Sequence, residues 1–341
     1  MVFIALVGAG GKSCQRFENC CFYRRSAMDK LKILFDTDIG TDIDDALALT
    51  FLLNEPRCEL LGITTCTGEA EERAKLASML CLHANRPDIP IYPGPDGCLI
   101  VDQIECSAPQ KEVLSKWPHQ KEFRKGYAIE FLRKTIRENP GEITLIAVGP
   151  MTNIALLFSV DPEIPKLLKG LYLMCGQFSN IEGTIPDNPL SAFINRERIR
   201  YIYLGICDMN ASVDPHATSI VYRAPVKEHH SVGYDLTRKI VLNPDEFFKV
   251  FDCKKTAPMM DMARIWFQSV DGVGFHDPSP TLSVFYDDVV EYEKGNVNVD
   301  LDSRMFQGYI DYRPAPEGKH WVSKSVNGEN LFRHYRDVLG T

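Results

Sequence analysis

From residue 30 onward, the apolar residues follow two patterns that alternate along the chain. Continuous apolar or β-branched runs are expected to form buried strands; they are LKILF (31–35), CELLGITT (58–65), ITLIAVG (143–149) and GLYLMCG (170–176). Other segments carry apolar residues at helical spacing; they are DDALALTFLL (44–53), EAEERAKLASMLCLHA (69–84) and PMTNIALLFSV (150–160). Strand followed by helix, repeated, predicts an α/β fold with an open, mainly parallel (mixed) sheet flanked by helices.

The pattern gives no sign of a second domain. No internal repeat, low-complexity tract or Ser/Gly linker interrupts residues 28–341, which we expect to form one large domain. Residues 1–27 show no clear period, and their apolar start lacks the basic region of a secretory signal. The stretch GAGGKS also fails as a phosphate-binding loop, because Leu6 stands where the first glycine is required. We expect residues 1–27 to be a disordered extension.

Composition narrows the possible partners. The formal net charge of -8 argues against nucleic-acid binding, which favours a basic face. No apolar stretch approaches the roughly 20 residues of a membrane span. The 11 cysteines are odd in number and form no CxxC pair, so they predict a reducing, cytoplasmic compartment and no zinc site.

One segment crowds negative charge. DTDIGTDIDD (36–45) contains five aspartates in ten residues, directly after a predicted strand and before a predicted helix. Buried carboxylates repel one another, so the segment is either a solvated loop or a site where a cation holds the carboxylates together. Ligands of open α/β sheets sit at the carboxyl ends of the strands, which favours the cation. Oxygen-rich clusters suit Ca²⁺ or Mg²⁺.

Two familiar acidic motifs match poorly. An EF-hand starting at Asp36 would need a glycine where Thr41 stands and a glutamate where Leu47 stands. A Mg²⁺-dependent phosphatase of the haloacid-dehalogenase type would use FDTDIGT with Asp287 and Asp288. That motif has one residue too many before Thr41, and no convincing lysine motif follows.

The whole acidic segment, DTDIGTDIDDALAL (36–49), resembles the amino-terminal signature of the inosine/uridine-preferring nucleoside hydrolases. Further segments resemble that family in the same order; they are LLGITTCTGEAEERA (60–74), AVGPMTNIAL (147–156), CDMNASVDPHATSIVYRAP (207–225) and GFHDPSP (274–280). The resemblance spans about residues 31–300 and implies a single Rossmann-like domain that binds Ca²⁺. It also implies hydrolysis of the N-glycosidic bond of ribonucleosides, in purine or pyrimidine salvage, by a homodimer or homotetramer.

The resemblance also implies roles for individual residues. Calcium ligands would be Asp38, Asp45, the main-chain carbonyl of Thr152, and Asp277. Asp38 would also take a proton from the attacking water, and His276 would protonate the leaving base. The ribose hydroxyls would be bound by Asp44 and Asp277, with Glu69, Asp208 and Asn210 as further substrate-binding candidates.

Some positions depart from the family pattern. The first loop is two residues longer, apparently through Thr41 and Asp42, and Asp208 replaces the usual glutamate. Glu69 stands where many members have asparagine, so it binds ribose or simply lies in the first turn of a helix. Because of these departures, a catalytically weakened metal- and ribose-binding homologue remains an alternative.

Residues outside the motifs are less specific. Asp36 is expected to be structural, accepting backbone N–H groups near the helix start. A long insertion at 179–207 contains Asn180 and Asn188 as candidates for a 5′-hydroxyl ligand. Aromatic residues that could stack a base are more often core residues; they are Trp266, Phe267, Phe275 and Tyr286.

Overall fold

The computed structural model describes residues 30–178, 207–303 and 306–341. The predicted amino-terminal extension, residues 1–27, therefore lies outside the described residues. The same is true of Asn180, Asn188 and nearly all of the 179–207 insertion.

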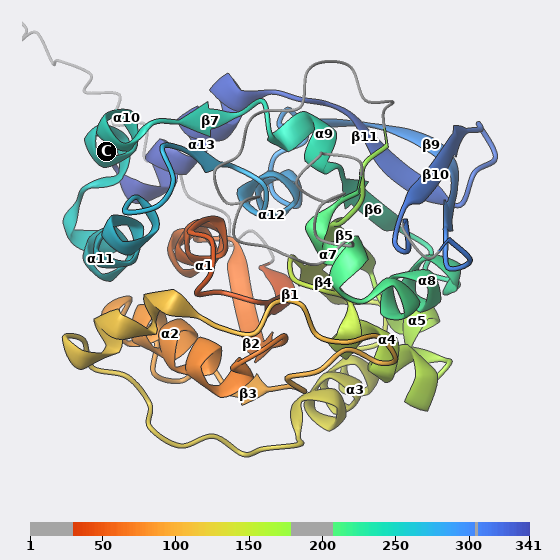
Figure 1. The fold of residues 1–341 in the computed structure, drawn as a ribbon, viewed down its shortest axis with the longest axis horizontal. Coiled ribbons are helices and arrows are strands. Elements are labelled where there is room, and N and C mark those ends of the chain that lie inside the picture. Colours follow the sequence, from red (N-terminus) through yellow and green to blue (C-terminus); the bar gives the residue numbers. More distant parts are fainter. Residues whose placement is uncertain (1–29, 179–206, 304–305) are drawn as a thin grey trace, which may run out of the picture.

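The described residues build a nine-stranded mixed sheet in the order β10-β9-β11-β6-β5-β4-β1-β2-β3 (Figure 1). Seven strands run parallel; they are β1 (Leu31–Thr37), β2 (Cys58–Thr65), β3 (Ile91–Pro93), β4 (Ile143–Ala147), β5 (Gly170–Met174), β6 (His229–Val232) and β11 (His320–Val326). At one edge, β9 (Val290–Val299) and β10 (Ile310–Pro314) add antiparallel pairs. A separate small sheet pairs β7 (Val241–Leu242) with β8 (Val273–Gly274).

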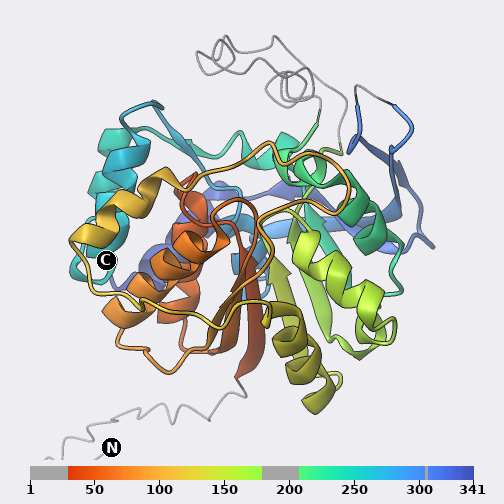
Figure 2. The same ribbon diagram turned by 60° about the horizontal axis from the view of Figure 1, so that its bottom comes forward.

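Helices cover both faces of the sheet (Figures 1 and 2). Those that contribute to one core are α1 (Asp44–Asn54), α2 (Ala70–His83), α10 (Pro244–Phe251), α11 (Ala257–Trp266), α12 (Pro278–Ser283) and α13 (Gly328–Leu339). Those that contribute to the other are α3 (Ala128–Glu138), α4 (Thr152–Val160), α5 (Ile164–Leu167), α7 (Met209–Val213) and α8 (Pro215–Arg223). Shorter elements are α9 (Tyr234–Thr237) and the 3₁₀ helices η1 (Pro109–Ser115) and η3 (Lys254–Thr256).

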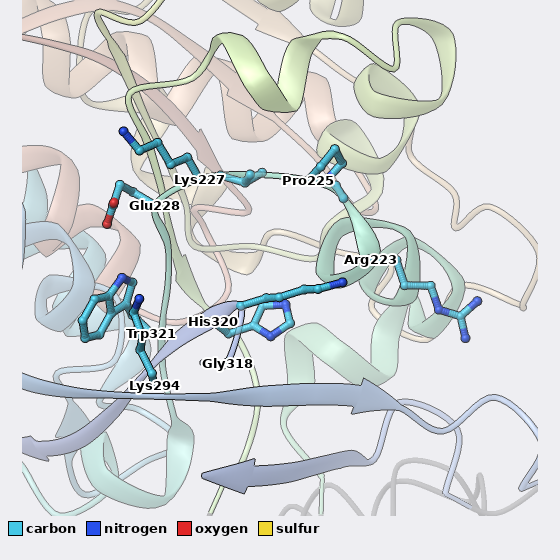
Figure 3. Close-up of a pocket in the computed structure, with 11 residues that line it drawn as sticks. Arg223, Pro225, Lys227, Glu228, Lys294, Gly318, His320 and Trp321 are labelled. Carbon is cyan, nitrogen blue, oxygen red and sulfur yellow. The ribbon is translucent and has the colours of Figure 1, made fainter. Parts of the chain in front are cut away.

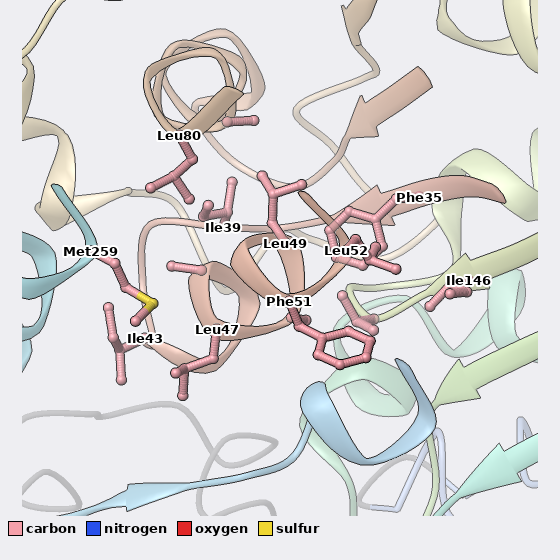
Figure 4. Close-up of a cluster of buried hydrophobic side chains, with 14 of the residues drawn as sticks. Phe35, Ile39, Ile43, Leu47, Leu49, Phe51, Leu52, Leu80, Ile146 and Met259 are labelled. Carbon is pink, nitrogen blue, oxygen red and sulfur yellow. The ribbon is translucent and has the colours of Figure 1, made fainter. Parts of the chain in front are cut away.

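Strand β1 shows why the chain needs two cores. Ile33 and Phe35 point into the first core, whereas Leu34 between them points into the second. Because successive strand residues face opposite sides, a strand covered on both faces reads as a continuous apolar run. The first core is built around α1, which presents Leu47, Leu49 and neighbouring residues (Figure 4).

The aromatic residues considered as base-stacking candidates belong to this first core. Phe275 is fully buried in it, and Trp266, Phe267 and Tyr286 pack against it. Tyr286 also stacks on His334 and lies under the Arg57 guanidinium, with which it shares Glu55 as a partner. The interpretation of these aromatics as core residues is therefore confirmed.

The strand order places a topological switch point at the acidic loop. From β1, the chain builds β2 and β3 on one side, and β4, β5 and β6 on the other. The loops that leave the carboxyl ends of β1 and β4 consequently diverge, and ligands of such sheets bind at this switch point. The acidic loop leaves β1 there.

The fold prediction is confirmed: one α/β domain with a large, mostly parallel mixed sheet flanked by helices. Among the described residues, no helix has the length and apolar composition needed to cross a bilayer. Among the described residues, Cys58, Cys66, Cys81 and Cys175 are buried thiols that form no disulfide.

Candidate active site at the carboxyl ends of β1 and β4

Three carboxylates converge at the start of α1. Asp44 and Asp45 form its first turn, and Asp277 precedes α12. One oxygen from each carboxylate lies within 4.8 Å of the others, and all three side chains are buried. The Thr37 hydroxyl donates to Asp45, and the Asp277 N–H donates to Asp44 Oδ2 at 3.4 Å. Residues 233 positions apart in sequence thus supply a single oxygen-rich cluster.

Without a cation, the negative charges of these buried carboxylates are unfavourable, and the pKa values of the carboxyl groups rise. Burial raises the pKa of Asp44 to about 8 and that of Asp45 to about 7, and neighbouring carboxylates add to both rises. Burial likewise raises the pKa values of Asp38 and Asp277 well above the usual range. Carboxylates in this state must hold protons or face a cation. The donor set, all hard oxygen atoms, fits a divalent cation such as Ca²⁺ or Mg²⁺.

Asp38 lies beside this group but on the β4 side of the loop. A Cβ added to Gly149 would come within 2.8 Å of Asp38 Oδ1 and 2.9 Å of Cys66 Sγ. The glycine of AVGPMTN therefore gives the Asp38 carboxylate its place against the β4–α4 turn. The position of Asp38 thus depends on the β1–α1 loop that carries it and on the β4–α4 turn that leaves room for its carboxylate.

Gly149→Ala is expected to displace the Asp38 carboxylate and to lower catalytic turnover at least about tenfold, because small misplacements at a reacting centre are costly. The protein should still fold, which thermal unfolding would verify. Gly97→Ala is the matched control, since a Cβ at Gly97 would meet nothing within 4 Å. Equal activity of the two variants would contradict this account of Asp38.

Asp36 is structural, as expected, but its partners differ from the prediction. Its carboxylate accepts Asn153 Nδ2 at 2.8 Å and Thr64 Oγ1 at 3.2 Å, and Asn153 Nδ2 also reaches the Thr65 carbonyl. The prediction that Asp36 accepts backbone N–H groups near the helix start was therefore wrong. Asp36 lies at the end of β1 rather than in the helix, so side chains of β2 and α4 reach it first.

Thr152 begins α4, and its hydroxyl donates to Asp214 Oδ2 at 2.8 Å. Asp214 also accepts the Leu99 N–H at 2.8 Å and caps α8 through the Ala217 N–H. Sequence reasoning did not single out this residue. The Asp-Pro at 214–215 was the available signal, because proline is favoured at the first helical position and aspartate before it.

After β5, the chain returns to the site through α7. Asn210 Nδ2 donates to the carbonyls of Val148 at 2.5 Å and Met174 at 2.8 Å, which joins the ends of β4 and β5. Asp208 caps α7 by accepting the Ala211 N–H at 2.9 Å, and burial raises its pKa to about 6. Asn210 is therefore fixed at the ends of β4 and β5, and Asp208 has a structural role as the cap of α7.

Glu69 lies in a turn with two left-handed residues, Thr67 (φ 71°) and Glu69 itself (φ 61°). Such non-glycine conformations cost about 1–3 kcal/mol each and gather at functional sites. The Glu69 carboxylate accepts Lys111 Nζ and the Ala108 N–H. Hydrogen bonding to Lys111 lowers its pKa. Glu69 thus lies at the position before the first turn of α2, and its side chain is hydrogen-bonded to residues of the 105–111 segment.

His276 directly precedes Asp277 in the chain. Its Nδ1 is 2.7 Å from Thr237 Oγ1, and its ring lies 5.2 Å from that of Tyr234. A Cβ at Gly274 would fall 2.2 Å from His276 Nε2, so this glycine makes room for the ring. Burial lowers its pKa to about 4, and the imidazole is neutral near pH 7.

Other acidic and basic features lie elsewhere. Asp288, a candidate for the phosphatase interpretation, is bound on the surface by Arg333 and His334 of α13. A hollow of about 360 Å³ lies at the amino ends of β6 and β11, the opposite end from the carboxylates (Figure 3). It is lined by basic side chains, including Lys227, Lys294 and Lys319, and offers no cluster of metal ligands.

Comparison with known proteins identifies the family of the chain. The family model for the inosine-uridine preferring nucleoside hydrolases matches residues 33–332. The chain is 30% identical over 319 residues to the probable uridine nucleosidase 2 of Arabidopsis thaliana, covering 87% of this chain and 91% of that protein. It is 28% identical over 298 residues to the non-specific ribonucleoside hydrolase RihC of Salmonella typhi, covering 81% and 90%.

Solved structures match as well. The purine-preferring ribonucleoside hydrolase of Gardnerella vaginalis superposes with a TM-score of 0.73 at 21% identity, covering 90% of this chain and 98% of that one. At this identity the likeness concerns the fold. The family match over most of the chain carries the assignment: the chain belongs to the inosine-uridine preferring nucleoside hydrolase family of N-glycosidases.

Proposed function

We propose that this enzyme hydrolyses the N-glycosidic bond of ribonucleosides to free base and ribose, with Ca²⁺ as its metal. One observation carries the proposal: Asp44, Asp45 and Asp277 converge in a buried cluster, with Asp38 beside them, at the switch point of the sheet. Relatives named uridine nucleosidase and ribonucleoside hydrolase support the substrate class.

In this mechanism, bond breaking runs ahead of water attack, so positive charge develops on the ribose ring. Buried carboxylates stabilise that charge more strongly than exposed ones would, because the surroundings have a low dielectric constant. Asp44 and Asp277 bind ribose hydroxyls, and Asp38 accepts the proton of the attacking water. A divalent cation held by Asp38, Asp45, Asp277 and the Thr152 carbonyl would lower the pKa of a bound water and anchor the sugar.

His276 acts on the leaving base in this proposal. Its burial keeps the imidazole neutral. The Thr237 hydroxyl, 2.7 Å from Nδ1, holds the ring in place. To act as the general acid, the imidazole takes up a proton from solvent, and the imidazolium gives that proton to the departing base and returns to its neutral form. Purines present N7 as an acceptor for this proton, whereas pyrimidines have no N7.

His276→Ala is therefore expected to lower kcat about 10²-fold for inosine, and less for uridine, because general acids commonly contribute about 10²- to 10⁴-fold. Steady-state kinetics on both nucleosides would test this. His83→Ala is a suitable control, because His83 contacts the Lys254 carbonyl and the Trp117 ring away from the carboxylates. Unchanged kcat for both nucleosides would remove His276 from the mechanism.

The function itself is tested by release of reducing sugar from inosine, uridine, adenosine, guanosine and cytidine. The proposal expects release from at least one of them, and the panel would rank the bases. Removal of metal should abolish the release. Re-addition of Ca²⁺ should restore it more fully than Mg²⁺.

A second candidate rests on Asp208 and Glu69. Both carboxylates are already engaged, one as the cap of α7 and the other with Lys111 and Ala108. If neither carboxylate binds the ribose hydroxyls, the protein would bind metal and ribonucleoside but hydrolyse little of it. Isothermal titration with inosine and uridine, alongside the sugar assay, separates binding without turnover from catalysis. Association into a homodimer or homotetramer stays a prediction, which sedimentation would test.

A further inference from the structure

We propose that Arg73 is a positioning residue for the reaction: its buried guanidinium fixes the main chain that carries Asp38 and neutralises part of the charge of the acidic cluster. The inference rests on the proposed function for its effect on turnover. Its structural part concerns the metal-free protein and can be tested without any substrate.

The Arg73 side chain belongs to α2 and is completely buried. Nη1 donates to the Asp38 carbonyl, and it is 3.3 Å from the Ile39 carbonyl and 3.0 Å from Thr41 Oγ1. These acceptors lie in the loop that follows β1. One side chain of α2 thus holds the carbonyl groups of two successive peptides, at Asp38 and Ile39.

The other arms of the guanidinium reach two further segments. Nε donates to the Gly68 carbonyl at 2.9 Å, in the turn that follows β2. Nη2 donates to Glu105 Oε1 at 2.9 Å and to the Ser107 carbonyl at 3.2 Å. Arg73 therefore ties together the β1–α1 loop, the β2–α2 turn and the 105–107 segment.

The same segment closes over the apparent two-residue insertion. Thr41 Oγ1 donates to Glu105 Oε1 at 2.5 Å, and Gln110 Nε2 donates to the carbonyls of Thr41 and Asp42. Gly40, at φ +120°, fits against Leu76 and Ala108, where a side chain would clash. The longer loop is thus fixed by specific partners, with Arg73 beneath it.

The charge of Arg73 also faces the carboxylates. Nη2 pairs with the Glu105 carboxylate at 2.9 Å and Nη1 donates to the Asp38 carbonyl, so the positive charge lies beside the acidic loop and offsets part of its negative charge. A buried, always protonated group is suited to this because its geometry and charge are both permanent. Lysine would keep the charge but lose the planar fork, so the two contributions can be separated by substitution.

Arg73→Lys tests the geometric part. We expect kcat to fall about 10- to 100-fold with KM and Ca²⁺ affinity changed less than about threefold, because the loop shifts while the charge stays. Arg57→Lys is the matched control: Arg57, like Arg73, is paired with a glutamate, here Glu55, but it lies beyond the carboxyl end of α1, far from the acidic loop in sequence. Wild-type kcat in Arg73→Lys, or an equal fall in Arg57→Lys, would overturn the inference.

Thr41→Val is a second test of the positioning role, and it remains informative if the Arg73→Lys variant does not fold. It removes the hydroxyl that lies between Arg73 and Glu105 and nearly preserves the side-chain shape. A three- to tenfold fall in kcat at unchanged KM supports the positioning role. An unchanged kcat in this variant counts against it.

Arg73→Met tests the charge part by thermal unfolding at pH 8, with chelator and with excess Ca²⁺. We expect Tm to fall further in chelator than with Ca²⁺, so the rise in Tm on adding Ca²⁺ exceeds that of the wild type. Simple damage to packing would lower Tm equally in both conditions and would overturn this part. Should the wild type release no sugar from any nucleoside, the proposed function fails, whereas this comparison still decides whether Arg73 neutralises the cluster.

Discussion

Asp38→Asn is expected to lower kcat for nucleoside hydrolysis about 10³-fold without destabilising the protein. Asparagine keeps the shape of the side chain and one oxygen acceptor but cannot accept a proton from water. General bases commonly contribute about 10²- to 10⁴-fold to rate. The buried carboxylate of Asp38 is repelled by Asp45, Glu105 and Asp42, so its neutralisation should relieve repulsion in the metal-free protein.

The measurement is kcat at saturating nucleoside together with the thermal unfolding temperature in chelator. Asp288→Asn provides the control, because Asp288 undergoes the same chemical change on the surface, paired with Arg333 and His334. It also tests the phosphatase interpretation, in which Asp288 would be required. Retention of a tenth or more of wild-type kcat in Asp38→Asn would exclude Asp38 as the base.

Asp45→Asn is expected to weaken divalent metal binding by at least about 10²-fold and to abolish turnover at ordinary metal concentrations. Unit charges about 4 Å apart interact by about 4 kcal/mol at an effective dielectric constant of 20, and each 1.4 kcal/mol is about a factor of ten. Asparagine retains an oxygen to accept the Thr37 hydroxyl. The loss should therefore reflect charge rather than a broken contact.

The same variant should change how stability depends on pH. Burial raises the pKa of Asp44 to about 8 and of Asp45 to about 7, from an ordinary value of 3.8. Between about pH 4 and 8 the folded, metal-free protein then holds more protons than the unfolded chain, so its free energy of unfolding falls as pH rises. Asp45→Asn removes one of these groups, so this fall should be smaller.

Calorimetric titration with Ca²⁺ and unfolding scans in chelator at pH 5 and pH 8 would test both expectations. With excess Ca²⁺ the wild type should lose little Tm over this range, because the ion stabilises the charged carboxylates. A metal-free wild type that is more stable at pH 8 than at pH 5 would contradict the electrostatic account of the cluster.

Much of the fold was predictable because its strands and helices are strongly patterned. Within LKILF, residues Ile33, Leu34 and Phe35 are buried, and their side chains alternate between the two faces of the sheet. The apolar residues of α2 recur at helical spacing. The acidic loop was predictable as a site for a related reason. Five aspartates at the end of a buried strand have few stable arrangements without a cation.

The partners of these residues were not predictable in the same way. Asp36 bonds to Asn153, 117 positions away, and Asp44 receives the Asp277 N–H across 233 positions. Arg73 lies in a helix whose sequence gives no sign that its side chain would be buried, since arginine is usually exposed. Such contacts depend on how strands are ordered, which local periodicity does not contain.

Asp208 and Glu69 show a second limit. Sequence identified both as departures from the family pattern, but a carboxylate that caps a helix and one that binds sugar look alike in a sequence. The structure assigns Asp208 to the cap of α7 and Glu69 to Lys111 and Ala108. The hydrogen-bond partners of both carboxylates could be identified only from the three-dimensional structure.

The central claim is that the buried aspartates serve a metal-dependent ribonucleoside hydrolase. Its most direct test is reducing-sugar release from the five common ribonucleosides by the wild type and Asp38→Ala, each with chelator and with Ca²⁺ restored. We predict release by the Ca²⁺-loaded wild type only, with none from Asp38→Ala in either condition. Absence of release from every nucleoside by folded, Ca²⁺-bound wild type would contradict the account, as would undiminished release by Asp38→Ala.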